Sequence, residues 1–303
     1  MEDIKQDITI LTETKKKGNG VEILGSYLHF YSGVPKEKRA KRGVSILVKK
    51  RYNRYITTWE AINENMIKLH MNLFGKKVCI LGIYAISDDE NAVVKEDFFG
   101  KLNEVIAKIG NSRELVMAGD FNSRTGKKIN NLVVGPFGEE VINDNGDKLI
   151  DICEQNSLKI LNGYFQHKRI HQYTWHQDTQ ELRSIIDYII TRQNSGLKFQ
   201  DVRVLRRMTV GSDHYLVNAK ILFLHGKSKV NESKENITDG EMELLQGPTY
   251  NIDSLKDEST RFLYKKRLDE NLERVILKVQ KNVTNILLNA FTKQRKKHWE
   301  RKF

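Results

Sequence analysis

The 303-residue sequence lacks the features that mark secreted or membrane-spanning proteins. Its two cysteines, Cys79 and Cys153, each stand within an apolar pattern, so we expect small buried side chains and not a disulfide framework. No apolar run approaches the length of a membrane span. The first residues, MEDIKQDITIL, lack the basic start and apolar core of a signal peptide. We therefore expect a nuclear or cytoplasmic protein with no membrane partner.

Hydrophobic residues are also scarce, at 39% of the chain, whereas charged residues make up 30%. Lysine and arginine outnumber aspartate and glutamate by 51 to 39. The resulting net charge of +12 favours an anionic partner, most often nucleic acid. A basic protein that is merely soluble would carry the same charge.

Strand and helix patterns interleave up to about residue 225. Short apolar runs predict strands at residues 7–11 and 42–50, and a hairpin on either side of residues 74–76. Residues 88–109 have helical spacing and end at a glycine, and GDKLIDICEQNSL predicts a second helix. Further strands are predicted in ELVMAGDFN, LKILNGYF, SIIDYIIT, DVRVLRR and YLVNAKILF. The fold class is therefore α/β or α+β.

The composition changes after residue 225. Residues 226–252 are polar and nearly featureless, as is typical of a linker. Residues 253–303 carry an amphipathic helical stripe that ends in the basic run KQRKKHWERK. This helical arm is either a solvated helix with one docked or dimerised face, or an arm that contacts phosphates. The predicted domains are thus 1–225, 226–252 and 253–303.

A carboxylate, Asp187, interrupts the apolar strand pattern of SIIDYIIT. An unpaired buried charge costs several kcal/mol, so Asp187 needs a basic side chain, backbone amides or a histidine as its partner. His214, in GSDHYLV, is attractive because a carboxylate on one ring nitrogen fixes the tautomer and raises the basicity of the other. The alternative is an aspartate at a strand edge that faces water.

Asp120 and Asn122 are separated by one residue in GDFNSRTG. If this stretch is extended, both side chains point the same way. The carboxylate can then take a proton from water, and the amide can donate to a phosphate oxygen. Because Gly, Asp, Asn and Ser are all turn residues, an ordinary turn is the alternative.

Three other polar or aromatic residues stand at or near predicted strands. Glu13 could bind a hard metal ion such as Mg²⁺, or could pair with a nearby lysine. Tyr84 could donate a hydrogen bond to a phosphate, or could serve packing alone. Trp175 could stack on a base or sugar, or could complete the core.

Six motifs succeed one another along residues 1 to about 225: LTETK, GIYA, LVMAGDFNSRTG, YTWHQ, IIDYIIT and GSDHYLV. Together they resemble the endonuclease/exonuclease/phosphatase superfamily. TETKKKG, NDNGDKLIDIC and YTW are similar to the RTE-type non-LTR retrotransposon endonucleases and to the craniofacial development protein 2-like proteins. The linker and the basic arm also resemble the segment that lies after the endonuclease domain in such elements.

The resemblance implies a four-layered α/β sandwich of two mixed sheets between helices, and a metal-dependent endonuclease that nicks DNA by phosphodiester hydrolysis. Mg²⁺ or Mn²⁺ would be bound by Glu13, with Asp213 as a further ligand or its support. Asp120 would orient or deprotonate the attacking water. The other implied roles are a phosphate contact for His214 held by Asp187, scissile-phosphate binding by Asn122 and Tyr84, and substrate binding by Asn122, Trp175 and Arg124.

The family pattern begins before Glu13, with a strand that ends in an asparagine, whereas this chain starts at Met1, too late to contain it. We expect an unpaired edge in the first sheet and the loss of an active-site amide, which would weaken the activity. The sequence is then either a truncated gene model or a decayed or host-adopted copy with weak or no activity. Thr12 and Ile86 stand where family members usually carry Gln and Pro. Two alternatives stay open: a catalytically dead nucleic-acid-binding or interaction protein, and a phosphatase or phosphodiesterase of the same fold.

Overall fold

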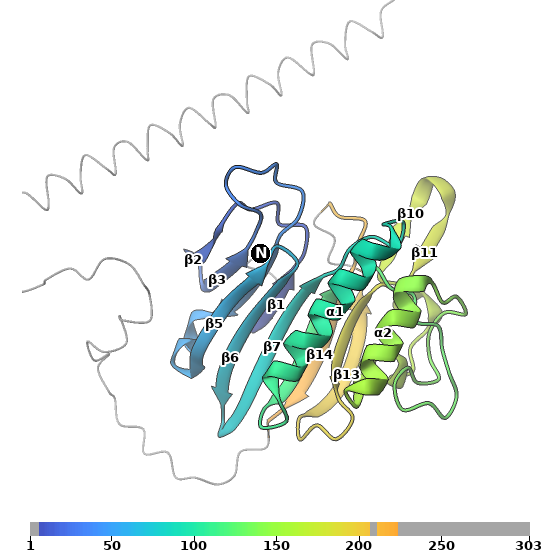
Figure 1. Ribbon diagram of the computed structural model, residues 1–303. Coiled ribbons are helices and arrows are strands. Elements are labelled where there is room, and N and C mark those ends of the chain that lie inside the picture. Colours follow the sequence, from blue (N-terminus) through green and yellow to red (C-terminus); the bar gives the residue numbers. More distant parts are fainter. Residues whose placement is uncertain (1–5, 207–210, 224–303) are drawn as a thin grey trace, which may run out of the picture. The chain divides into compact units, whose positions relative to one another are not determined.

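Two β-sheets pack face to face in the computed structural model (Figure 1), which describes residues 6–206 and 211–223. Both the predicted linker and the predicted helical arm lie outside these residues. The smaller sheet is antiparallel throughout, with strand order β1-β4-β3-β2. Its strands are β1 (Ile8–Leu11), β2 (Asn19–Leu24), β3 (Tyr27–Ser32) and β4 (Val44–Lys49).

The larger sheet has the order β5-β6-β7-β8-β12-β9 and is mixed, because β7 and β8 run parallel while the other pairs are antiparallel. A parallel pair requires a crossover, and helix α1 provides it. The strands are β5 (Ile56–Asn63), β6 (Met66–Leu73), β7 (Lys76–Tyr84), β8 (Glu114–Asp120), β9 (Leu158–Ile160) and β12 (Asp187–Arg192).

Helices α1 (Ala92–Ile109) and α2 (Asp144–Gln155) pack together on the outer face of the larger sheet (Figure 1). The first helix begins four residues later than predicted, because the Asn91 side chain caps it by accepting from the Val94 amide. Within the described part of the chain, no α-helix covers the smaller sheet. The mixed α/β class with stacked sheets is confirmed, and the second helical layer of the predicted sandwich is not among the described elements.

The central strands β7 and β12 of the larger sheet are buried on both faces, which explains their nearly continuous apolar sequences. In β6, Met66 faces the helices while Ile67 and Leu69 face the smaller sheet, and all three are 0% exposed. Cys79 and Cys153 are free and buried, as predicted. None of the helices in the described residues is both long and apolar enough to cross a membrane.

Two hairpins complete the described fold. β10 (Trp175–Gln177) pairs with β11 (Leu182–Ser184), and β13 (Lys198–Leu205) pairs with β14 (Leu216–Leu222). β1 packs against β8 and β14 against its neighbour β12, yet no β-bridge joins β1 to β14 within 6–206 and 211–223. Each of these two strands thus has one edge without a β-bridge among the described residues.

Several element predictions need correction. The strand predicted in LKILNGYF ends at Ile160, and Leu161–Tyr164 is a 3-10 turn, because Asn162 bonds the backbone of β12. Other 3-10 turns are Lys50–Tyr55, Arg169–His171 and Asp178–Gln180. Strands β2, β3, β5, β10 and β11 were not predicted, and β2 has mostly partly exposed or exposed residues without a clear apolar alternation.

Candidate active site

Three neighbouring strands place polar side chains in one row. β7 ends at Tyr84, β8 ends at Asp120 and β12 begins at Asp187. Tyr84 is opposite Asp120 in the parallel pair, and Asp120 is opposite Asp187 in the antiparallel pair. The register of the sheet therefore brings these three residues together at one end of the strands.

His214 contacts Asp187 as predicted: its Nδ1 lies 3.0 Å from Oδ2 and 3.2 Å from Oδ1. Asp187 is the first residue of β12 and not an interior strand residue. His214 precedes β14 and forms an isolated bridge with Trp175, which positions it beside β12. The side chains of His214 and Asp187 are 29% and 15% exposed, so solvent only partly screens the pair.

The carboxylate of Asp120 lies beside this pair, with ligand atoms of Asp120, Asp187 and His214 all within 4.8 Å of one another. Burial raises the pKa of Asp120, and the negative charge of Asp187 raises it further. The positive charge of His214 and the amide of Asn122 oppose this only in part, so the pKa stays well above its usual value. Such a carboxylate is a stronger base than an exposed one.

Burial lowers the pKa of His214, but its hydrogen bond to Asp187 and the charges of Asp187, Asp120 and Asp213 outweigh it. The net result is a pKa of about 9. The imidazole is thus protonated at neutral pH and can donate from Nε2. In this protonated state the imidazole serves as a hydrogen-bond donor and not as a metal ligand. When deprotonated, its nitrogen and the two carboxylates lie close enough together to hold a metal ion.

Glu13 lies on the other side of the row. The Tyr84 hydroxyl donates to its Oε1 at 2.7 Å, and burial, with the contact to Glu13, raises the Tyr84 pKa so that the hydroxyl remains a donor. The carboxylate itself is 60% exposed, with the Lys15 ammonium 3.9 Å from Oε2. Glu13 has a positive φ of 51°, an uncommon backbone conformation for a residue with a side chain.

Asp213 is held by Trp175, whose indole Nε1 donates to Oδ2 at 2.9 Å. The backbone of Asp213 also accepts from the His176 amide at 3.1 Å. The polar edge of Trp175 is therefore already used within the protein. Stacking of its ring on a base or sugar stays a prediction.

Asn122 departs from the extended arrangement that we predicted. Its φ is +46°, and its amide turns back to donate to Asp120 Oδ1 at 2.9 Å. The side-chain Nδ2 donates to the Ala85 carbonyl at 3.0 Å. The turn alternative is thus right for the local backbone, because the Asp120 carboxylate competes successfully for the amide. A role in phosphate binding stays a prediction.

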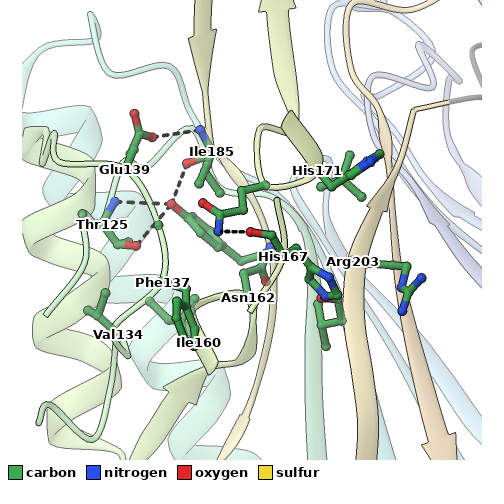
Figure 2. A pocket seen from close by; sticks show the side chains of 17 residues that line it. Thr125, Val134, Phe137, Glu139, Ile160, Asn162, His167, His171, Ile185 and Arg203 are labelled. Carbon is green, nitrogen blue, oxygen red and sulfur yellow. Dashed lines mark hydrogen bonds between the residues drawn. The ribbon is translucent and has the colours of Figure 1, made fainter. Parts of the chain in front are cut away.

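Arg124 forms an ion pair with the buried Glu139, donating from Nε at 2.9 Å. Glu139 in turn accepts from the Ile185 amide, as Figure 2 shows. These bonds tie the loop after β8 to the entry of β12. The adjoining cavity, lined by Thr125 and Tyr188 among others, has a volume of about 20 Å³, which suits roughly one water molecule and no nucleotide.

Sequence reasoning missed the residues that hold the backbone of the site. Thr174 is 0% exposed, and its Oγ1 accepts from the Asp187 amide at 3.1 Å. Asn162 donates to the Asp187 carbonyl at 3.0 Å. Asn145, also fully buried, donates to the Asn122 carbonyl at 3.2 Å and to the Ile86 carbonyl at 3.0 Å. Thr174 and Asn145 lie in the YTW and NDNG segments, whose resemblance to known endonucleases was a sequence signal for a role in the site.

The oxygen donors at this end of the strands fit a hard divalent cation such as Mg²⁺ or Mn²⁺. Glu13 adds to the negative charge that raises the Asp120 pKa, so three carboxylates contribute to the charge of this end of the sheet. Neither Glu13 nor Asp213 belongs to the group of three ligand atoms within 4.8 Å. Their predicted role as metal ligands therefore rests on donor chemistry and on exposure.

The chain is similar to known proteins in both sequence and fold. A family model described as endonuclease-reverse transcriptase matches residues 78–218, which include Tyr84, Asp120, Asp187 and His214. Craniofacial development protein 2 of Tragulus javanicus is 29% identical over 222 residues. That match covers 73% of this chain and 38% of the relative, so the chain spans well under half of the relative's length.

Solved structures share the fold at low sequence identity. A 3′ phosphatase from Neisseria, NExo, bound to a product DNA hairpin, has a TM-score of 0.53 at 17% identity, covering 73% of this chain and 91% of its own. The endonuclease domain of TRAS1, a telomere-specific non-LTR retrotransposon, has a TM-score of 0.53 at 16% identity, covering 73% and 88%.

Proposed function

We propose that this chain is a metal-dependent DNA endonuclease of retrotransposon origin, of the endonuclease/exonuclease/phosphatase superfamily that its fold and its relatives suggest. One observation carries the proposal. Side chains from positions 13 to 214 converge on one end of the strands and supply a buried carboxylate, a protonated histidine and an exposed carboxylate. Metal-assisted hydrolysis of a phosphodiester uses these groups as a general base, a hydrogen-bond donor to the phosphate and a metal ligand.

Asp120 accepts a proton from the attacking water and holds that water in line with the phosphorus. Its raised pKa suits a general base, and the Asn122 amide fixes one of its oxygens. His214 donates from Nε2 to a non-bridging phosphate oxygen and stabilises the charge that develops there. Asp187 orients the imidazole through Nδ1.

Glu13 would hold Mg²⁺ or Mn²⁺, with Asp213 as a further ligand or its support. When bound, the ion neutralises phosphate charge and stabilises the leaving oxygen. Tyr84 keeps Glu13 Oε1 directed toward the row of strand ends through its 2.7 Å hydrogen bond. Trp175 positions Asp213 in the same way.

The test is nicking of supercoiled plasmid DNA with Mg²⁺ by the full chain and by the variant Asp120→Ala. We expect relaxed circles with the wild type and at least about a hundredfold slower nicking by the variant, because the general base is lost. Asp201→Asn is a matched control, since Asp201 also pairs with a histidine, His167, at 2.9 Å but lies outside the row of strand ends.

A phosphatase on the same scaffold is the second candidate, and the fold shared with the Neisseria 3′ phosphatase favours it. A hairpin with a 3′ phosphate separates the two functions. Release of inorganic phosphate without plasmid nicking would replace the endonuclease assignment by the phosphatase. A folded protein that catalyses neither reaction but still binds DNA in the presence of chelator would be a nucleic-acid-binding protein and not an enzyme.

A further inference from the structure

Two loops beside Glu13 are joined by backbone hydrogen bonds. The Thr14 amide donates to the Gly43 carbonyl at 3.1 Å, and the Gly18 amide donates to the Val34 carbonyl at 2.7 Å. The Gly33 amide returns to Gly18 at 2.9 Å. Residues 14–18 therefore hold residues 33–43 close to the metal-binding side of the proposed site.

This joined region is strongly basic. Residues 14–43 contain eight lysines and arginines against two glutamates, so their net charge is +6, half of the chain's +12. Three of these cations form ion pairs: Lys15 lies 3.9 Å from Glu13, Lys16 binds Glu22, and Arg42 lies 3.6 Å from Glu90. Lys17 donates to the Lys36 carbonyl at 3.0 Å, which secures the second loop.

Four exposed cations remain, which we call the basic loop: Lys36, Lys38, Arg39 and Lys41. None of them forms a side-chain hydrogen bond or an ion pair with another residue in the described ranges. Like charges so close in sequence repel one another, and a polyanion would relieve that repulsion. Glu37, which lies between Lys36 and Lys38, offsets only one of these four charges. A small phosphate ester bound at the strand ends would leave the others without a counterion.

We propose that the basic loop binds the backbone phosphates of a DNA strand beside the scissile phosphate. This inference rests on the proposed function and deepens it, since it makes the substrate a nucleic acid longer than the bond that is cleaved. The loop contributes affinity without base specificity, because ammonium and guanidinium groups contact phosphates and not base edges. It is tied by backbone bonds to Thr14, the residue after Glu13, so strand binding and phosphate placement are coupled.

The test measures binding of a fluorescent DNA duplex in chelator at several salt concentrations, so that cleavage plays no part. The loop variant carries Lys36→Gln, Lys38→Gln, Arg39→Gln and Lys41→Gln. Each lost phosphate contact lowers the slope of log affinity against log salt by about 0.9, so we expect a slope smaller by roughly 2 to 4. Exposure of all four side chains predicts unchanged folding, checked by circular dichroism.

A control variant removes the same number of exposed lysines from the opposite side of the fold: Lys77→Gln, Lys108→Gln, Lys198→Gln and Lys220→Gln. Lys77 lies seven residues before Tyr84 in β7, roughly 20 Å away at the rise of a strand. The control should change the slope by less than about 1. Equal slopes for the loop variant and the wild type, or an equal loss in the control, would overturn the inference.

The outcome is separable from that of the proposed function. If Asp120→Ala abolishes nicking while the loop variant keeps the wild-type salt slope, the endonuclease stands and the basic loop does not bind DNA. If no nicking occurs but the loop variant loses its salt dependence, the loop stands as a DNA-binding surface and the hydrolase assignment fails.

Discussion

His214 and His29 are each bound by a carboxylate at Nδ1, yet their pKa values move in opposite directions. Asp187 lies 3.0 Å from His214, and Glu22 lies 2.8 Å from His29. Burial lowers the pKa of both rings. The pKa of His214 nevertheless rises to about 9, whereas the pKa of His29 stays below its usual value.

The surroundings of the two pairs explain the difference. His29 is only 5% exposed, and its partner Glu22 is shared with the ammonium of Lys16. The positive charge of Lys16 further disfavours protonation of His29. At His214, by contrast, further carboxylates add to the effect of the first one. A carboxylate partner therefore does not decide the charge of a buried histidine, because the balance of all nearby charges does.

Removing each imidazole should separate the two sites most sharply. His214→Gln is expected to slow plasmid nicking by about 10² to 10⁴, because a donor to the phosphate is lost. His29→Gln should stay within about twofold of the wild type, since His29 lies outside the row of strand ends. Rates measured under single-turnover conditions with Mg²⁺ would refute the assignment if the two variants were equally slow.

Removing each carboxylate should move the pKa values themselves. With Asp187→Asn, burial is opposed by fewer charges, so the pKa of His214 should fall from about 9 by roughly two units. Glu22→Gln should lower the pKa of His29 further, because Glu22 favours its protonation. Proton NMR titration of the imidazoles in chelator measures both shifts, and an unchanged His214 would show that Asp187 is not its main partner.

The pH dependence of stability should have opposite signs at the two pairs. His214, whose folded pKa is raised from 6.5 to about 9, stabilises the fold fully below pH 6.5 and loses this effect toward pH 9. The loss relative to His214→Gln is at most about 3 kcal/mol. His29, whose folded pKa is lowered, contributes fully above pH 6.5 and loses stability as the pH falls. The measurement is urea unfolding in chelator from pH 5 to 9. Both signs would be contradicted if the free energies of unfolding of the His214→Gln and His29→Gln variants changed with pH in parallel with that of the wild type.

The smallest effect is expected at Lys16. Lys16→Gln removes a positive charge near His29 and frees Glu22, so the pKa of His29 should rise. His214 should not respond. The same imidazole titration reads both rings in one experiment, and a fall in the His29 pKa would refute the explanation given for the two pairs.

Much of the fold was predictable because apolar spacing is a local signal. Helix α2 and strands β6, β7, β8 and β14 are predicted by runs that alternate or repeat within a few residues. Strands β2 and β5 were missed because most of their residues are exposed or half-buried, so neither sequence has a regular apolar alternation. Within the site, the residue types of Asp120 and His214 were informative, whereas Thr174 and Asn162 act through backbone contacts that no local pattern reveals.

The sequence by itself determined the α/β class, the burial of both cysteines and which side chains are able to do chemistry, because residue type and apolar period are properties of short stretches. Only the tertiary structure decided that Tyr84, Asp120 and Asp187 share one row, because strand register depends on pairing between distant segments. It also decided the charge of each histidine. The sign of a pKa shift depends on burial and on all charges within a few ångströms, and these come together only on folding.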